Sequence, residues 1–322
     1  MAMLLRRGLL VHPEELDEIW LDEIEKTNLN VLGLHPVGGK NAARTLEAAI
    51  AQHQSPDFQR LIARAKGLGL TVEYEAHALT HLLPRELFAA HPEYFRMDEH
   101  GERVPDANLC PSSAEALALV EENAEKLTKA LDAGSARRFW WPDDVSGKLC
   151  HCPLCRALNG GDQLLRITNA IHRGVRRADP QARTAYLAYH DGLTLPRLTE
   201  PEDGLFLEYA PIGRDHHRPI TDAACAENAA QTATLQPLLS FFGRSDAQVL
   251  DYWMDNSLFS NWTKPPRRFS LDADVMARDV EFYEGLGFES ITSFACYLGA
   301  DYRALYGLPP AADYARILDG NM

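Results

Sequence analysis

Short hydrophobic segments alternate with longer amphipathic segments along most of the chain. The hydrophobic segments are rich in Val, Leu, Phe and Tyr, and most are followed by a stretch with the period of a helix. This alternation is typical of parallel strands connected by crossover helices. The predicted strands are residues 8–11, 30–35, 70–77, 138–144, 184–190, 204–209, 248–253 and 290–296, and the predicted helices are 13–26, 58–67, 113–133, 162–178, 228–242, 272–285 and 300–318.

Eight strand segments separated by helices predict an α/β fold, a single (β/α)8 TIM barrel spanning residues 1–322. No linker rich in Pro, Gly or Ser divides the chain, whereas a long insertion is expected around residues 91–112. The connection at 191–203 is too short for a full helix. A doubly wound open sheet is the structural alternative, although Val37-Gly38-Gly39-Lys40 lacks the glycine spacing and the Ser or Thr of a phosphate-binding loop.

Charge and composition narrow the classes of partner. The 322 residues carry 32 Lys and Arg against 46 Asp and Glu, a formal net charge of -14, which argues against nucleic acid as a partner. We see no secretory leader and no apolar run long enough to span a membrane. The cysteines are unevenly spaced and a chain of this length needs no disulfides, so a reduced, cytoplasmic environment is expected.

The predicted strands become polar at their C-terminal ends, where barrel enzymes place their chemistry. A single acidic residue at a strand end is usually a helix cap or a surface charge, and a single histidine is usually structural. Recurrence at consecutive strand ends instead favours a functional site. The residues concerned are His35, Glu75, His77, Trp141, Asp143, Asp144, Tyr189, His190, Glu208, Tyr209, Asp251, Trp253 and Asp255.

Carboxylates together with large aromatic side chains indicate a glycoside hydrolase with a carbohydrate substrate. Cleavage of a glycosidic bond needs one protonated and one ionised carboxyl group, and aromatic faces stack on sugar rings. The sequence distinguishes neither a retaining from an inverting mechanism nor one oligomeric state from another. We predict Asp143, Asp144, Glu208 and Asp251 as catalytic, and His35, Glu75, His77, Trp141, Tyr189, His190, Tyr209, Trp253 and Asp255 as substrate-binding.

A cysteine cluster follows the acidic pair. Cys150, Cys152 and Cys155 supply three thiols within six positions, and Cys110 could complete a tetrahedral set for a structural zinc ion. Reduced, buried thiols are the alternative reading. The carboxylate chemistry itself requires no cofactor.

The motif Trp141-Pro142-Asp143-Asp144, the cysteine cluster, Asp162-Gln163 and Asn169 resemble a large uncharacterised bacterial family of glycoside-hydrolase-like barrels. The likeness covers most of the chain, including residues 91–95, Gly101 and residues 109–111. The tandem aspartates also look like those of O-GlcNAcase-type hexosaminidases. That resemblance implies that Asp143 orients the 2-acetamido group of an N-acetylhexosaminide and that Asp144 is the general acid. A looser similarity to alpha-glucuronidases implies uronides, whose carboxylate Arg214 or Arg218 would pair with.

Two other functions fit parts of the same pattern. A metal-dependent barrel hydrolase or isomerase would draw its ligands from His35, Glu75, His77, His190 and Asp251. A non-catalytic carbohydrate-binding barrel would keep the aromatic residues and use the carboxylates only to bind sugar hydroxyls.

Overall fold

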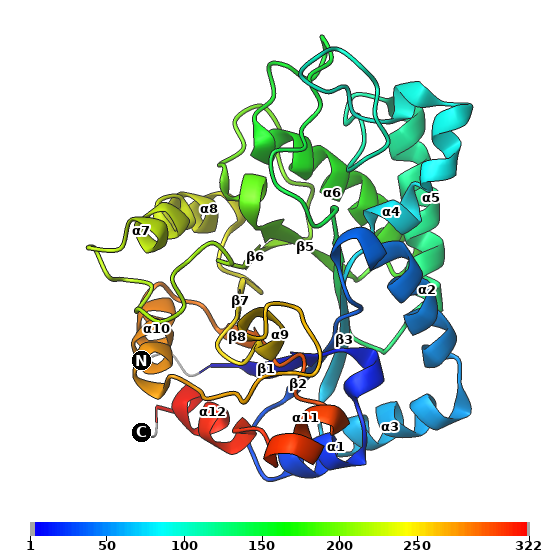
Figure 1. The fold of residues 1–322 in the computed structure, drawn as a ribbon. Helices are drawn as coiled ribbons and strands as arrows, with labels where there is room; N and C mark the ends of the chain where they lie inside the picture. The colour runs from blue at the N-terminus through cyan, green and yellow to red at the C-terminus, as the bar shows by residue number, and fades with distance from the viewer. Residues whose placement is uncertain (1–3, 321–322) are drawn as a thin grey trace. The chain divides into compact units, whose positions relative to one another are not determined.

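The computed structural model describes residues 4–320, in which eight parallel strands close into a barrel in chain order (Figure 1). The predicted (β/α)8 fold is therefore confirmed, and each predicted strand segment overlaps an observed strand. The strands are β1 (Arg6–Val11), β2 (Val31–Leu34), β3 (Thr71–His77), β4 (Arg137–Trp141), β5 (Arg183–Ala188), β6 (Leu205–Tyr209), β7 (Gln248–Asp251) and β8 (Ser290–Phe294).

Strand β1 shows why these segments are hydrophobic on both faces. It pairs in parallel with β2, with Gly8 opposite Val31, and with β8, with Leu10 opposite Phe294. Leu9, Leu10 and Val11 are completely buried, as strands packed on both faces require. Gly8 allows a close approach, because a Cβ atom there would lie 2.7 Å from the Cβ of Val31.

The described chain divides into two compact units. Residues 1–35, 54–73 and 208–322 form unit 1, and residues 36–53 and 74–207 form unit 2. Unit 1 carries the helices α1 (Glu18–Glu25), α3 (Pro56–Gly67), α7 (Ala226–Thr232), α8 (Leu235–Phe242), α9 (Asn256–Phe259), α10 (Ala273–Gly285), α11 (Ala300–Tyr306) and α12 (Ala311–Leu318). Unit 2 carries α2 (Ala42–His53), α4 (Leu79–Leu82), α5 (Ala114–Ala130) and α6 (Gly160–Ala178).

Three predicted helices have corrected boundaries. The helix expected over 13–26 consists of a 3-10 turn (Pro13–Glu15) followed by α1. The helix expected over 228–242 is α7 and α8, and that expected over 300–318 is α11 and α12. The break between α11 and α12 follows from Gly307, which adopts a left-handed φ of 86°, and from the Pro309-Pro310 pair, which cannot continue a helix. Helix α2 was not predicted.

In unit 2, helices α5 and α6 pack side by side over most of their length (Figure 1). The side chain of Ser113 caps α5, and Asn159 and Asp162 form a capping box at the start of α6. A Cβ at Gly174 of α6 would overlap the backbone of α5 at Glu121. The close contact between the two helices therefore depends on this glycine.

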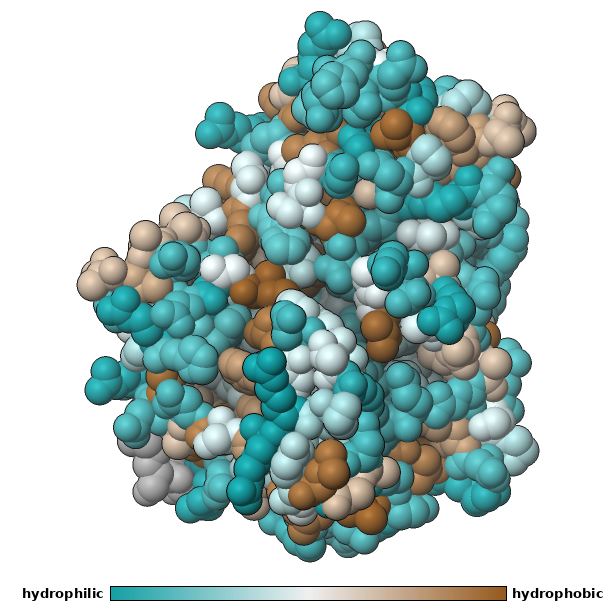
Figure 2. Space-filling model, in the orientation of Figure 1, coloured by the Kyte–Doolittle hydropathy of each residue, from teal (hydrophilic) through white to brown (hydrophobic). Residues whose placement is uncertain are grey.

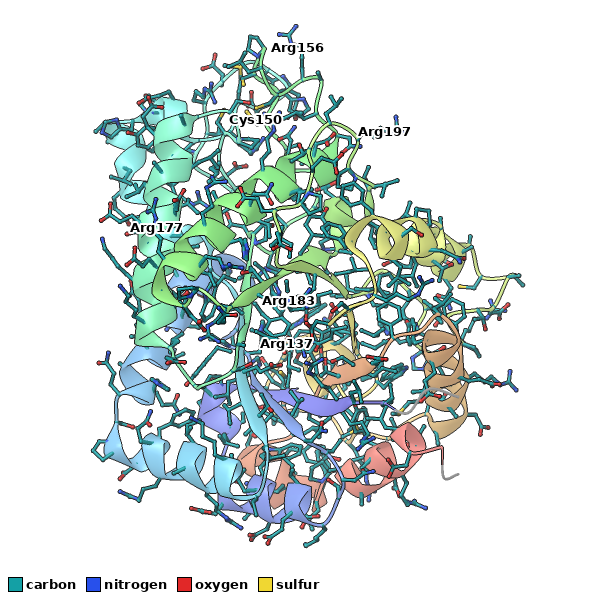
Figure 3. All side chains as sticks on the ribbon, turned by 180° about the vertical axis from the view of Figure 1, so that it is seen from behind. Arg137, Cys150, Arg156, Arg177, Arg183 and Arg197 are labelled. Carbon is teal, nitrogen blue, oxygen red and sulfur yellow. The ribbon has the colours of Figure 1, made fainter. Side chains whose placement is uncertain are left out.

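Two arginines lie where β4 and β5 begin (Figure 3). Arg137 and Arg183 are direct partners in the parallel register. The guanidinium of Arg137 lies 4.8 Å from the ring centroid of Phe139 and 4.9 Å from that of Phe206. Because aromatic faces attract cations, these rings offset part of the cost of burying the charge.

The surface is mainly polar on the face shown in Figure 2, where hydrophobic residues are scattered among hydrophilic ones. Large hydrophobic side chains are exposed at separate positions, Trp262 at 59% and Leu154 at 72% being the most accessible aromatic and aliphatic examples. Over the described residues, no helix combines the length and the apolar character needed to cross a membrane.

Candidate active site and cysteine cluster

The tandem aspartates follow directly after β4 in unit 2, and their side chains have contrasting surroundings. The Asp143 side chain is 8% exposed, whereas that of Asp144 is 30% exposed. The structure thus distinguishes a buried carboxylate from an accessible one.

Asp143 is held by three donors from other segments of unit 2. Its Oδ1 accepts the Thr80 hydroxyl at 2.7 Å, and its Oδ2 accepts the backbone N–H of Asn108 at 2.6 Å and pairs with the Arg85 guanidinium. In return, the backbone N–H of Asp143 donates to the side-chain oxygen of Asn108 at 3.2 Å. Sequence reasoning missed these partners, since Thr80, Arg85 and Asn108 belong to no predicted strand end.

Asp144 contacts two residues that were predicted as substrate-binding. Its Oδ1 accepts the Tyr189 hydroxyl at 2.8 Å, and the same oxygen lies 3.9 Å from Nε2 of His77. The Nδ1 of His77 is 2.7 Å from the carbonyl oxygen of Pro142 and therefore carries a proton. In the neutral ring this leaves a lone pair on Nε2, on the side of Asp144.

Aromatic rings surround this pair. Trp141 packs edge-on against His77, with centroids 5.1 Å apart, and Tyr189 lies 6.0 Å from it. His190 packs against Tyr189 at 3.9 Å and has a left-handed φ of 47°, which is uncommon outside glycine. Burial lowers the pKa of His190, while nearby Asp144 and Asp191 oppose this shift.

A small pocket adjoins Asp143 and is lined by residues of unit 2. Its polar lining residues are His77, Asn108, Asp143, Tyr189 and Asp191. The glycine-rich segment after β2, which sequence reasoning discounted as a phosphate loop, borders the same residues. A Cβ at Gly38 would lie 3.0 Å from Oδ2 of Asp144 and 3.0 Å from Cδ2 of His77. No sequence signal other than the glycine pair marked this approach.

Glu75 of β3 is also in unit 2, fully buried and opposite Phe139 of β4. Together, His77, Trp141, Asp143, Asp144, Tyr189 and His190 form the acidic site, the name used below for this group.

The predicted residues of unit 1 form separate groups. Asp251 is completely buried, with Oδ2 2.9 Å from Nη1 of Arg214 and 3.0 Å from the Tyr283 hydroxyl. Arg214 also pairs with Asp279 at 2.6 Å, so its guanidinium is engaged by two internal carboxylates. This corrects the expectation that Arg214 would meet a uronate, because its side chain has no exposed surface.

Glu208 and Tyr209 at the end of β6 are buried as well. The side-chain amide of Gln248 donates to Glu208 at 3.0 Å, and the ring of Tyr209 packs against Tyr283 with centroids 6.0 Å apart. The indole N–H of Trp253 donates to Asp279 at 2.9 Å. Trp253 also lines a surface pocket together with His216, His217, Phe259 and Phe269.

His35 and Asp255 have structural contacts in unit 1. The carbonyl oxygen of His35 accepts Nδ1–H of His12 at 2.7 Å, and the two rings stack with centroids 5.8 Å apart. Asp255 caps α9 by accepting the backbone N–H groups of Ser257 and Leu258. Burial raises the pKa of Asp255 above its ordinary value.

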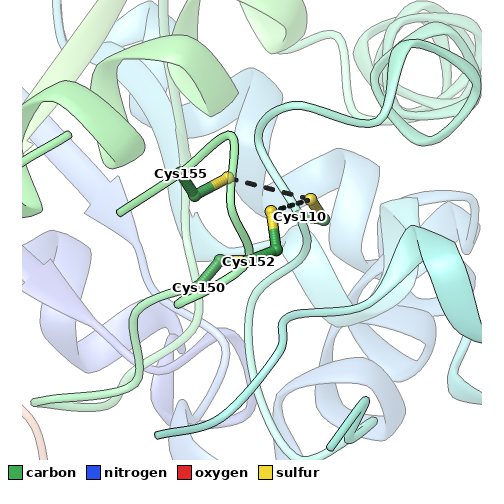
Figure 4. Close-up of side chains that lie close together, drawn as sticks. All are labelled: Cys110, Cys150, Cys152 and Cys155. Carbon is green, nitrogen blue, oxygen red and sulfur yellow. Dashed lines mark hydrogen bonds between the residues drawn. The ribbon is translucent and has the colours of Figure 1, made fainter. Parts of the chain in front are cut away.

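The four clustered cysteines converge in unit 2, as the sequence predicts. Their Sγ atoms all lie within 4.8 Å of one another, and each residue is buried (Figure 4). The Sγ of Cys110 is 3.7 Å from that of Cys152 and 3.8 Å from that of Cys155. A zinc ion with bonds of about 2.3 Å to four thiolates separates the sulfurs by about 3.8 Å, whereas a disulfide requires about 2.05 Å.

A backbone amide and an arginine contact the sulfur of Cys150. The backbone N–H of Met97 donates to Sγ of Cys150 at 3.3 Å, and Arg103 lies 3.9 Å from the same atom. Hydrogen bonds from neighbouring thiols, Cys150 first, lower the pKa of Cys110. Among the described residues, the four cysteines form the one group of three or more His, Cys, Asp or Glu side chains whose donor atoms converge. Glu75, His77 and His190, three of the ligands considered for a catalytic metal ion, form no such group.

The fold of the barrel resembles those of several solved glycoside hydrolases. The β-galactosidase of the psychrophilic Marinomonas ef1 superposes with a TM-score of 0.58 at 11% identity, over 98% of this chain and 59% of that chain. The O-GlcNAc hydrolase of Thermobaculum terrenum gives 0.55 at 12% identity, over 98% and 59%. The endo-β-1,4-glucanase Xac0029 of Xanthomonas axonopodis pv. citri gives 0.53 at 9% identity, over 99% of both chains.

The chain belongs to the family described as Domain of unknown function (DUF4838), whose model matches residues 40–236. This confirms the resemblance to an uncharacterised family. No curated protein matches the sequence. The chain spans 59% of the length of the Marinomonas enzyme, and at these identities the structural likeness establishes the fold.

Proposed function

We propose that this protein is a glycoside hydrolase in which Asp144 is the general acid and Asp143 its positioning partner. The observation that carries the proposal is the contrast between the two carboxyl groups. The Asp144 side chain is 30% exposed and contacts Tyr189 and His77, whereas the Asp143 side chain is 8% exposed and both of its oxygens are engaged by protein donors. A proton donor must reach the leaving oxygen, which suits the accessible residue.

His77 lies beside Asp144. Its Nδ1–H donates to the Pro142 carbonyl oxygen, and its Nε2 lies 3.9 Å from Oδ1 of Asp144. Tyr189 orients the carboxyl group from the other side. Tyr189 and His190, which are half-buried, supply the aromatic surface on which a sugar ring would stack. Trp141 is 1% exposed, which corrects the expectation that its ring would contact the substrate.

A second carboxylate must stabilise the sugar cation or activate water. Glu208 and Asp251, which lie at the ends of β6 and β7 in unit 1, stay predictions for this role. Both are completely buried, and Asp251 is paired with Arg214, so substitution of each tests whether it takes part in the reaction or only supports unit 1. His35, Glu75, Tyr209, Trp253 and Asp255 likewise stay predictions as substrate-binding residues.

The decisive experiment is a screen of the purified protein against aryl glycosides, including N-acetylhexosaminides and uronides, with Asp144→Asn in parallel. We expect hydrolysis by the wild type and a loss of at least about a hundredfold in kcat/KM for the variant, because general acid catalysis contributes about 100- to 10,000-fold. Asp57→Asn, an exposed aspartate of α3, is the matched control and should retain wild-type activity. Full activity in Asp144→Asn would refute the assignment.

We also propose that Cys110, Cys150, Cys152 and Cys155 bind a structural zinc ion. Their sulfur separations fit a tetrahedral thiolate site, and Arg103 offsets the negative charge that four thiolates leave after binding Zn²⁺. Such a closed site has no position for substrate, so it would stabilise the fold without taking part in the reaction. Elemental analysis of untagged protein should find one zinc per chain in the wild type and none in Cys152→Ser.

A further inference from the structure

We infer that the zinc centre formed by the four cysteines positions Asp143, and that Asn108 transmits this effect. The inference rests on the proposed function and on the proposed metal, and it assigns a role to a residue outside every predicted motif. The four cysteines lie in two loops, residues 91–110 and 142–158. Asn108 lies in the first loop, two residues before Cys110, and it bonds to Lys148 in the second loop, two residues before Cys150.

The contacts of Asn108 link the two loops directly. Its backbone N–H and side-chain oxygen bond to Asp143, at 2.6 and 3.2 Å. Its side-chain amide donates to the carbonyl oxygen of Lys148 at 3.2 Å. Its own carbonyl oxygen accepts from Arg85, the ion-pair partner of Asp143, at 2.8 Å. Asn108 therefore contacts both the carboxylate and the cation that neutralises it.

The positions along the chain connect these contacts to the metal. Asn108 precedes Cys110 by two residues, and Lys148 precedes Cys150 by two residues. Fixing the two sulfurs on one ion fixes the two ends of the Asn108–Lys148 bridge. Asn108 is 5% exposed and has a left-handed φ of 46°, which Asn adopts more readily than most residues that bear a side chain.

The first loop has little regular structure to hold it in place. Between His91 and Cys110 the described backbone contains one short 3-10 turn and a single antiparallel bridge, Met97 to Arg103. An ion pair from Arg96 to Asp106 lies within the loop, and bonds to the second loop include those from Arg96 to the Leu149 carbonyl and from the His151 N–H to the Met97 carbonyl. A metal cross-link between the loops would supply the order that secondary structure does not.

Two variants separate the metal from the residue that transmits its effect. Cys152→Ser removes a ligand, and Asn108→Gly removes the side chain while tolerating the left-handed backbone. We expect Cys152→Ser to lose zinc and Asn108→Gly to keep one zinc per chain. Both should lower kcat about ten- to a hundredfold with little change in KM, because a displaced catalytic group affects the reaction more than binding.

Hydrogen exchange measured by mass spectrometry gives a readout that does not depend on activity. In Cys152→Ser, we expect faster exchange in peptides covering 94–110 and 142–152, with exchange in β1 and β8 unchanged. In Asn108→Gly, the increase should be confined to peptides near residues 108 and 143. Cys225→Ser is the matched control, because Cys225 is a buried cysteine of unit 1 outside the cluster, and it should resemble the wild type.

Wild-type protein without zinc, purified under reducing conditions, would overturn the inference. So would a zinc-free Cys152→Ser protein whose residues 142–147 exchange at the wild-type rate. If the wild type hydrolyses no glycoside, the proposed function fails, but zinc content and exchange still decide whether the metal orders the loop of Asp143.

Discussion

Gly38 and Asp144 show how one missing side chain shapes the acidic site. Gly38 has ordinary extended backbone, φ -77° and ψ -156°, so its conformation does not require glycine. What requires glycine is space, since an added Cβ would lie 3.0 Å from both the Asp144 carboxylate and the His77 ring.

We predict that Gly38→Ala lowers kcat/KM about tenfold or more without destabilising the fold. The added methyl group would displace the Asp144 carboxyl or the His77 ring by a few tenths of an ångström, and catalytic geometry is sensitive to such shifts. The measurement is steady-state kinetics on the substrate that the aryl glycoside screen identifies, together with a thermal melt.

Gly67→Ala is the control for that substitution, because a Cβ at Gly67 of α3 meets no atom within 4 Å. It should leave both kinetics and melting temperature unchanged. Equal activity of Gly38→Ala and Gly67→Ala would contradict the role given to the close approach at Asp144.

At this scale, the sequence predicts the residues that follow strands and misses those that come from loops. His77, Trp141, Asp143, Asp144 and Tyr189 meet because β3, β4 and β5 are neighbours in the barrel, which the strand pattern implies. The partners of Asp143 were not predictable, since Thr80, Arg85 and Asn108 approach it through loop conformations that no periodic pattern encodes.

Among the elements, strands were easier to locate than helix ends. Each buried strand is a short, nearly continuous hydrophobic run, which has few alternative explanations. Helix α2 lacks such a clear apolar pattern, because it buries only Ala42, Leu46 and Ala49 and two of these are small. The break between α7 and α8 at Ala233 and Thr234 precedes Pro237, which lies in the first turn of α8 and is a break signal inside the helix expected over 228–242.

Helix α6 also anchors the irregular connection that follows β5. One oxygen of Asp162 accepts the backbone N–H groups of Arg197, Leu198 and Thr199, at 2.9, 2.7 and 2.9 Å. Burial raises the pKa of Asp162, but these hydrogen bonds outweigh it and the net pKa is lowered. These hydrogen bonds to one carboxylate hold part of the 191–203 segment in place, where no α-helix follows β5 directly.

We predict that Asp162→Asn lowers the free energy of unfolding by about 1–3 kcal/mol, because a neutral amide accepts these bonds more weakly than a carboxylate. Urea denaturation should show a lower midpoint with an unchanged slope. Asp57→Asn, at the start of α3 and exposed, should cost much less; similar losses in both variants would argue against the anchoring role.

For the whole molecule, buried histidines make the stability of the fold depend on pH. Burial lowers the pKa values of His81, His172, His190 and His216 below the ordinary value of 6.5. The unfolded chain therefore binds protons on these groups before the folded protein does. Their contribution to stability is fully present above about pH 6.5 and is lost as the pH falls below it.

His172 isolates this effect. Its Nε2 donates to the Asp203 carbonyl (3.0 Å), and its Nδ1 lies 2.9 Å from the Thr184 hydroxyl. Burial lowers the pKa of His172 and so favours the neutral ring. We predict that lowering the pH from about 7.5 to about 5.5 reduces the melting temperature of the wild type more than that of His172→Gln. Parallel losses in the two proteins would contradict this prediction.

The wild type must be compared with His172→Gln because the acidic residue Asp279 changes the stability with pH in the opposite direction to the histidines. Burial, with nearby Asp251, raises the pKa of Asp279 to about 6. The folded protein then binds this proton before the unfolded chain does, which stabilises the fold as the pH falls through about 6. Because both proteins contain Asp279, its contribution cancels in the difference.

Asp279 belongs to a buried group of three charged side chains, with Asp251 and Arg214, each of which depends on the others. Arg214 lies between Asp251 and Asp279 with no exposed surface on any of the three side chains. Loss of the arginine alone would leave two buried carboxylates facing each other, whereas joint replacement by apolar residues of similar size is the change that buried ion pairs tolerate. The three positions are therefore expected to be inherited as one unit, and related chains should carry either the complete triad or none of it.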